Sequence, residues 1–124
     1  MAEGLVLEEQ RKLARRELIY YLKIVDRKTG SELGRMGDIH TAGMLVLSEK
    51  PLTVGAVYDM SLEMPKSVQA DGPKEVLLEC EALWTRPGPK VNNFHESGVR
   101  FLSVNEDQRE AINKLIDLYA MPSQ

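Results

Sequence analysis

Alternation of apolar and polar residues in two central segments limits what this chain can fold into. In residues 56–64 and 76–84 every second residue is apolar, and acidic residues occupy several of the positions between them. The apolar positions are Ala56, Tyr58, Met60, Leu62 and Met64 in the first segment and Val76, Leu78, Cys80, Ala82 and Trp84 in the second. Successive side chains of a strand point to opposite faces, so this period predicts two half-buried β-strands.

Shorter segments predict further strands. Residues 18–25 are rich in the β-branched and aromatic residues that strands favour, and turn-forming residues follow them. We expect additional strands over residues 33–40, 44–47 and 99–102, and a loop over residues 65–73. The prolines of the segment Arg86-Pro87-Gly88-Pro89 predict that the preceding strand ends there.

The end of the chain carries the signals of an amphipathic helix over residues 105–120. Asn105 is a favoured N-cap, and Gln108 follows three residues later, as in a capping box. Apolar residues then recur on one helical face, namely Ala111, Ile112, Leu115, Ile116 and Tyr119. About six strands and one helix in 124 residues predict a single, mainly β domain. Its expected form is a six-stranded antiparallel barrel (18–102) with a C-terminal α-helix covering it and an N-terminal arm (1–17) before it.

Charge and composition exclude several classes of protein. Sixteen Lys and Arg against 19 Asp and Glu give a net charge of −3, whereas proteins that bind long nucleic acid usually carry a broad basic surface. The apolar runs are too short to span a membrane, and the N-terminus lacks the basic and apolar regions of a signal peptide. The single cysteine, Cys80, cannot form an internal disulfide. We therefore expect a cytoplasmic protein that neither binds long nucleic acid nor inserts into a membrane.

Residues suited to catalysis are sparse. The chain has two histidines, His40 and His95, and none of the common nucleotide-loop, zinc or redox-cysteine motifs. Cys80 lies on the apolar face of a predicted strand, which favours a buried small side chain over a nucleophile. Metal ligation needs clustered His, Cys or carboxylate side chains, and their spacing here offers no such cluster. The sequence predicts a protein that is not an enzyme and has no metal site and no cofactor.

Two polar segments remain as candidates for a binding site. The arm concentrates positive charge at Arg11, Lys12, Arg15 and Arg16. Guanidinium groups bind phosphates, and the O6/N7 edge of guanine, through paired hydrogen bonds. Residues 37–43, between two predicted strands, offer a carboxylate, hydrogen-bonding side chains and a glycine that permits a φ > 0 turn or a close backbone approach. Each segment alone also fits an ordinary feature, a solvated helix face or a β-turn.

Taken in order, the two segments resemble the PilZ domain, the bacterial receptor module for cyclic di-GMP. Members of the family carry an RxxxR motif on an N-terminal arm, and Arg11-Lys12-Leu13-Ala14-Arg15 fits it. A [D/N]xSxxG motif follows on the first strands of the barrel, and the segment from Asp38 to Gly43 fits it at both ends. Gly98-Val99-Arg100-Phe101 is also similar to the family, so the resemblance extends from Arg11 to about Leu102.

The resemblance implies a cyclic di-GMP receptor. Arginines would bind the phosphates and guanines of the ligand, a carboxylate would hold the arm or a base edge, and a glycine would let the backbone turn beneath it. The implied ligand contacts are Arg11, Arg15, Arg16, Asp38, His40 and Gly43. An arm that docks with the ligand would act as an order–disorder switch. A partner protein would read this change, and the family implies motility, pilus or exopolysaccharide machinery as that partner.

One position departs from the family pattern, because His40 stands where the motif has serine. Imidazole is larger than a hydroxymethyl group, so it either donates to a phosphate, stacks on a base or blocks the pocket. Lys12 and Arg16 also repeat the spacing of Arg11 and Arg15, which leaves the register of the arm open. A second hypothesis is therefore a PilZ-fold adaptor that binds proteins and not cyclic di-GMP.

A third hypothesis is an unrelated small barrel that binds single-stranded nucleic acid. Such modules stack bases on aromatic side chains, for which Tyr20, Tyr21 and Trp84 are available. An aromatic content of 6% and the negative net charge argue against it. We instead expect Trp84 to pack in the core or at the barrel rim, and Arg86 and His95 to be solvated loop residues.

Overall fold

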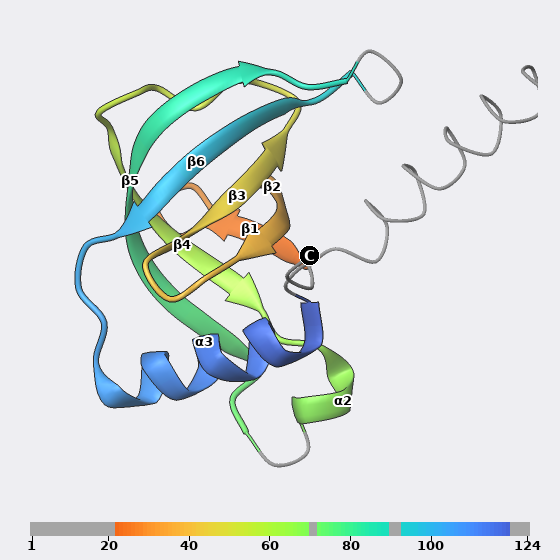
Figure 1. The fold of residues 1–124 in the computed structure, drawn as a ribbon, viewed down its shortest axis with the longest axis vertical. Coiled ribbons are helices and arrows are strands. Elements are labelled where there is room, and N and C mark those ends of the chain that lie inside the picture. Colours follow the sequence, from red (N-terminus) through yellow and green to blue (C-terminus); the bar gives the residue numbers. More distant parts are fainter. Residues whose placement is uncertain (1–21, 70–71, 90–92, 120–124) are drawn as a thin grey trace, which may run out of the picture.

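The protein is known from a computed structural model that describes residues 22–69, 72–89 and 93–119. These residues form a closed antiparallel barrel with the strand order β1-β2-β3-β6-β5-β4 (Figure 1). The elements are β1 (Lys23–Asp26), β2 (Glu32–Ile39), β3 (Gly43–Ser48), β4 (Val57–Glu63), α2 (Lys66–Gln69), β5 (Glu75–Pro87), β6 (His95–Phe101) and α3 (Glu106–Tyr119). The predicted six-stranded antiparallel barrel with a C-terminal helix is confirmed. The arm predicted over residues 1–17 lies outside the described residues.

Two three-stranded meanders build the barrel. The first is β1-β2-β3 and the second is β4-β5-β6, and each strand pairs with the next through a hairpin or loop. The meanders join along two seams, where β3 pairs with β6 and β1 pairs with β4. Gly30, with φ of +77°, provides the left-handed backbone that the turn between β1 and β2 requires. Each of the six pairings is antiparallel, as the alternating pattern of the strands predicts.

The inward-facing residues of the strands form a single apolar core. Its fully buried members include Ile24, Met36, Ile39, Val46, Met60, Leu62, Leu78 and Cys80. Helix α3 lies across one end of the barrel (Figure 1) and adds Ala111, Ile112 and Leu115 to this core. The inner face predicted for residues 56–64 is confirmed at Met60, Leu62 and Met64, each no more than 2% exposed.

The start of α3 has the capping box that the sequence predicts. The backbone N–H of Gln108 donates to Oδ1 of Asn105, and the backbone N–H of Asn105 donates to Oε1 of Gln108, both at 2.8 Å. These two bonds satisfy N–H groups that the first turn of a helix otherwise leaves open. The Gln108 amide also donates to the carbonyl oxygen of Leu77 at 2.5 Å, which ties the helix to β5.

One local prediction is confirmed and two are wrong. Strand β5 ends at Pro87, within the proline segment where the sequence predicts its end, and Pro87 pairs with His95 of β6. A proline is tolerated at the end of a strand, where no further ladder bond is needed. Strand β6 begins at His95 rather than at residue 99, so His95 is a strand residue. The loop predicted over residues 65–73 contains the single helical turn α2.

Candidate functional site

The outer surface of four neighbouring strands carries the second sequence motif. Because directly paired residues of an antiparallel sheet share a face, their side chains form rows across β2, β3, β6 and β5. One such row consists of Asp38, Leu45, Gly98 and Trp84. The adjacent row consists of Gly43, Arg100 and Glu81. We call these two rows the outer face, and they bring Asp38 and Gly43 of the predicted site onto one surface.

Asp38 faces outward because β2 contains a β-bulge just before it. Met36 pairs with Val46 and Asp38 pairs with Leu45, so Gly37 is the extra residue between the two pairs. A bulge reverses the alternation of the strand from that point on. Met36 is therefore buried in the core while Asp38, two residues later, is only half-buried on the other side. One carboxylate oxygen of Asp38 accepts a hydrogen bond from the backbone N–H of Ile39 at 2.9 Å.

The turn between β2 and β3 is closed by two hydrogen bonds. The backbone N–H of His40 donates to the carbonyl oxygen of Gly43 at 2.9 Å. The backbone N–H of Ala42 donates to Nδ1 of the His40 ring at 3.3 Å. Side chains that accept from the backbone two residues ahead stabilise turns in the manner of Asx and Ser/Thr turns. His40 itself is exposed and therefore accessible to a ligand or partner.

Gly43 is required by the close approach of two strands. A β-carbon at this position would overlap the carbonyl oxygen of Val99 and lie 3.2 Å from the Cα of Arg100, both of which are backbone atoms of β6. The sequence left a φ > 0 turn and a close approach open. Gly43 is not among the positive-φ glycines, so the close approach is the reason for this residue.

Trp84 is exposed on the outer face, contrary to its predicted place on the buried face of β5. The register of β5 against β6 shifts between Ala82 and Trp84, which makes Leu83 the extra residue of a second bulge. Ala82 is 1% exposed and Trp84 is 40% exposed, so the alternation reverses at this bulge. The apolar run Ala82-Leu83-Trp84 was the sequence signal for this reversal. The indole lies against Gly98, where the ring leaves no space for a β-carbon.

Two arginines flank Trp84, and each is held by one carboxylate. The guanidinium of Arg86 lies 5.0 Å from the centre of the Trp84 ring and donates from Nε to Glu96 at 2.8 Å. The guanidinium of Arg100 donates from Nε to Glu81 at 2.7 Å. Arg86 is exposed, as predicted, but it belongs to β5 and not to a loop, and it contacts two side chains. Sequence reasoning did not identify Arg100 as a candidate.

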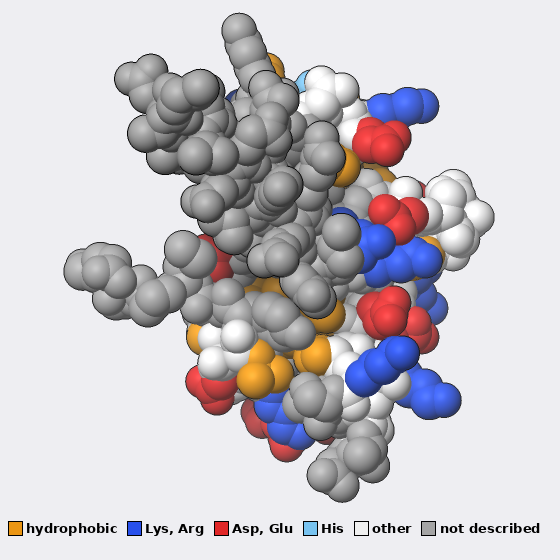
Figure 2. Space-filling model, turned by 90° about the vertical axis from the view of Figure 1, so that its right-hand side faces the viewer, with side chains coloured by type: hydrophobic (Ala, Val, Ile, Leu, Met, Phe, Trp, Pro, Cys, Tyr) orange, Lys and Arg blue, Asp and Glu red, His pale blue; other side chains and the backbone are white. Residues whose placement is uncertain are grey.

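These ion pairs leave the described outer surface close to neutral. Figure 2 shows acidic and basic side chains interspersed along one side of the molecule rather than gathered into separate patches. The three predicted arginines of the site, Arg11, Arg15 and Arg16, lie outside the described residues. The structure brings Asp38, His40 and Gly43 together and leaves the placement of those arginines as a prediction.

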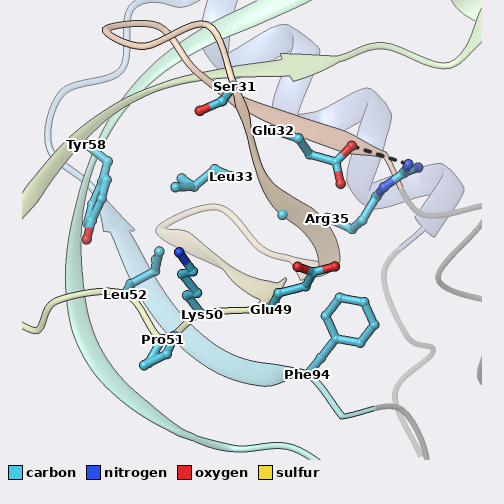
Figure 3. Close-up of a pocket in the computed structure, with 11 residues that line it drawn as sticks. Ser31, Glu32, Leu33, Arg35, Glu49, Lys50, Pro51, Leu52, Tyr58 and Phe94 are labelled. Carbon is cyan, nitrogen blue, oxygen red and sulfur yellow. Dashed lines mark ion pairs between the residues drawn. The ribbon is translucent and has the colours of Figure 1, made fainter.

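A cavity of about 810 Å³ lies at the other end of the β2–β3 hairpin. Leu33, Leu52 and Tyr58 gather on one side of it, and Arg35, Glu49 and Phe94 lie on the other (Figure 3). Glu32 and Arg35 form an ion pair of 3.6 Å at its rim. None of the predicted ligand contacts within the described residues lines this cavity. No feature of the sequence pointed to it.

Cys80 is the buried small side chain that the sequence predicts. Burial, with smaller contributions from Glu79 and Asp59, raises the pKa of its thiol to about 12. The thiol is therefore protonated at neutral pH and is not an activated nucleophile. Among the described residues there is no group of three or more His, Cys, Asp or Glu side chains that could hold a metal ion.

No helix within the described ranges is both long and apolar enough to cross a lipid bilayer.

Comparisons with known proteins agree on one family. The family model of the PilZ domain matches residues 9–118 of the sequence. Among solved structures, the PilZ domain with c-di-GMP of YcgR from Escherichia coli is similar in fold, with a TM-score of 0.60 and 16% sequence identity over 80% of each chain. A search of curated proteins found no match.

Proposed function

The chain belongs to the PilZ domain family, and from that membership we propose that it is a receptor for cyclic di-GMP. The ligand would bind on the outer face, between the barrel and the basic arm. The residues proposed to contact it are the six that the sequence motifs single out: Arg11, Arg15, Arg16, Asp38, His40 and Gly43. The protein would act by binding, without a catalytic step and without a bound cofactor.

One observation supports this site above the others. The bulge at Gly37 turns Asp38 out of the barrel and onto the surface that also carries Gly43. A bulge costs a ladder hydrogen bond, and bulges occur preferentially where a side chain has to be re-aimed. The carboxylate oxygen that does not bind Ile39 is available to N–H donors, such as N1–H and N2–H of a guanine. The similar fold of YcgR, which is described with c-di-GMP, is consistent with this use of the fold.

The proposed signal is a change in the arm. Three arginines carry enough positive charge to hold a ligand with two phosphates, whereas the described outer face is close to neutral and supplies little of this attraction. The arm would dock over the bound dinucleotide, and its altered surface would be read by a partner in the cytoplasm. By family resemblance, the partner would belong to motility, pilus or exopolysaccharide machinery.

A second function is favoured by His40, which occupies the serine position of the motif. The exposed imidazole is larger than a serine side chain and would reduce the room for a base or a phosphate in the proposed site. If it blocks the ligand, the same domain would be a protein–protein adaptor that does not bind cyclic di-GMP.

Isothermal titration calorimetry with cyclic di-GMP separates the two functions. We expect wild-type protein to release or absorb heat with a dissociation constant in the micromolar range or below, and Arg15→Ala to weaken binding by about 1–3 kcal/mol, the scale of a lost charged hydrogen bond. Arg109→Ala, on the exposed side of α3, removes the same charge away from the site and should leave the affinity unchanged. Absence of heat at high micromolar ligand would overturn the receptor function in favour of the adaptor.

A further inference from the structure

We infer that Arg100 is an additional ligand-binding residue, one that reads the O6/N7 edge of a guanine and is held in place by Glu81. The inference rests on the proposed binding of cyclic di-GMP and extends it to a residue outside both motifs. The observations that carry it are the position of Arg100, the geometry of its ion pair with Glu81, and the charge balance around it.

Arg100 lies at the centre of the outer face. It is the direct partner of Gly43 on one side and of Glu81 on the other. Its side chain is 54% exposed, so a ligand on this surface has access to it. Residues two apart along a strand are separated by about 7 Å. Arg100 is two residues beyond Gly98, so a single guanine base can extend from Arg100 to the row that contains Trp84. A ligand that contacts Gly43 therefore passes within reach of Arg100.

The ion pair fixes Arg100 without using the donors best suited to a base. Its hydrogen bond to Glu81 is donated from Nε, so the two terminal nitrogens, Nη1 and Nη2, remain outside that bond. These nitrogens present parallel N–H groups in a rigid plane, which matches the adjacent O6 and N7 acceptors of guanine. Glu81 is only 28% exposed and so restrains the flexible arginine in one orientation before the ligand arrives.

The charge balance favours a base edge over a phosphate at this position. The carboxylate of Glu81 already neutralises the guanidinium of Arg100 at 2.7 Å. A phosphate placed there would meet Glu81 and, across the outer face, Asp38, both of which repel it. The O6/N7 edge of guanine carries no net charge, so it gains two hydrogen bonds without this repulsion.

A ligand analogue tests the contact directly. In cyclic di-(7-deaza-GMP) a C–H group replaces N7, and the phosphates, riboses and O6 are unchanged. We expect wild-type protein to bind this analogue about tenfold more weakly than cyclic di-GMP, because one bond of a bidentate pair is lost. In Arg100→Ala, cyclic di-GMP itself should bind about tenfold or more weakly than it does to wild type. We define the ratio as the dissociation constant of the deaza analogue divided by that of cyclic di-GMP. This ratio should be about tenfold lower in Arg100→Ala than in wild type, since the variant has no donor for N7.

Further variants separate a hydrogen-bonding fork from a simple positive charge. Arg100→Lys keeps the charge but not the planar pair of donors, so its ratio should match that of Arg100→Ala. Glu81→Gln keeps an acceptor for Nε and should keep the wild-type ratio, whereas Glu81→Ala should lower it several-fold. Arg109→Ala controls for the loss of one positive charge and should behave as wild type.

The outcomes are distinguishable from failure of the proposed function. If wild-type protein binds neither dinucleotide, the receptor function is wrong and this inference is wrong with it. If wild type binds cyclic di-GMP and Arg100→Ala shows the same affinity and the same ratio, the inference alone is overturned. It is also overturned if Arg100→Lys retains wild-type affinity and ratio, because that result identifies a contact to a phosphate.

Discussion

The β2–β3 hairpin has two ends that are built in contrasting ways. At residues 38–43 the strands join through a short turn whose backbone and side chains bond to each other, and β3 presses against β6 at Gly43. At the other end, residues of the segments 31–35 and 49–52 line a cavity of about 810 Å³. A strand rises about 3.3 Å per residue, so the two ends lie ~20 Å apart. We call the end at residues 38–43, which carries the motif, the compact end. The end with the cavity is called the open end.

The cavity and the proposed site therefore lie at different ends of the hairpin. The charged residues of the cavity include both signs, with Glu32, Arg35, Glu49 and Lys50 around it, and they do not converge on one kind of ligand. The compact end instead offers a surface with an outward-facing carboxylate and an exposed indole. A flat dinucleotide held between such a surface and an arm needs no deep cavity, although pockets are the usual place for small ligands.

The largest effect is expected from Gly43→Ala at the compact end. The new methyl group would meet backbone atoms of Val99 and Arg100, which cannot move without shifting a strand. We expect the free energy of unfolding to fall by about 2–3 kcal/mol, the upper part of the range for overpacking. Urea denaturation followed by circular dichroism measures it.

Gly30→Ala provides a matched control near the open end. No atom lies within 4 Å of the new β-carbon, and only the φ of +77° opposes the substitution. The expected loss is therefore about 1 kcal/mol, the cost of a left-handed backbone for alanine. Equal losses for the two variants would show that Gly43 is not held by the approach of β3 to β6.

Variants at the two ends should also differ in their affinity for cyclic di-GMP. Asp38→Ala should weaken cyclic di-GMP binding by about 1–3 kcal/mol, because the guanine donors would lose their acceptor. Lys50→Ala, at the cavity, removes a charge ~20 Å away and should change the dissociation constant by less than about twofold. Calorimetric titration of both variants measures this. The reverse order of effects would place the ligand in the cavity and falsify the proposed site.

A smaller effect is expected from Tyr58→Phe at the open end. The Tyr58 hydroxyl accepts a hydrogen bond from the backbone N–H of Thr53 at 2.9 Å, next to the cavity. Loss of this bond should lower the stability by about 1 kcal/mol, the usual net contribution of a hydrogen bond. The affinity for cyclic di-GMP should not change, since the bond lies at the end opposite to the motif. A change in affinity without a change in stability would contradict this division between the two ends.

Features that depend on local sequence signals were predictable. The period-2 pattern located β4 and most of β5, since alternation over several residues directly reflects one buried face. The capping box of Asn105 and Gln108 was predictable because both of its bonds join residues three positions apart. The family motif singled out Asp38 and Gly43 as ligand contacts, which stays a prediction, and it did not say which backbone arrangement required the glycine.

The features that sequence reasoning missed depend on pairing between distant strands. A bulge inserts one residue and reverses the faces beyond it, so the alternation placed Trp84 on the apolar face of its strand, whereas the structure exposes it on the outer face. The start of β6 at His95 rather than at residue 99 likewise depends on its pairing with β3 and β5, which local propensity cannot reveal. Arg100 lies outside the two binding motifs, and only the register places it between Gly43 and Glu81.

The smallest effect is expected where the chain departs from its family, at His40. Its ring accepts the N–H of Ala42, two residues ahead, and a serine hydroxyl in the same turn can accept this N–H as well. His40→Ser should therefore leave the stability unchanged within about 0.5 kcal/mol, as for surface substitutions that keep their bonds. His40→Ala loses the acceptor, so its free energy of unfolding should be lower than that of the serine variant by up to about 1 kcal/mol.

In titrations with cyclic di-GMP we expect the serine variant to bind within about threefold of wild type, which corresponds to less than 1 kcal/mol. Binding that appears only in His40→Ser would show that the imidazole blocks the compact end, and the adaptor function would then replace the receptor function for this chain.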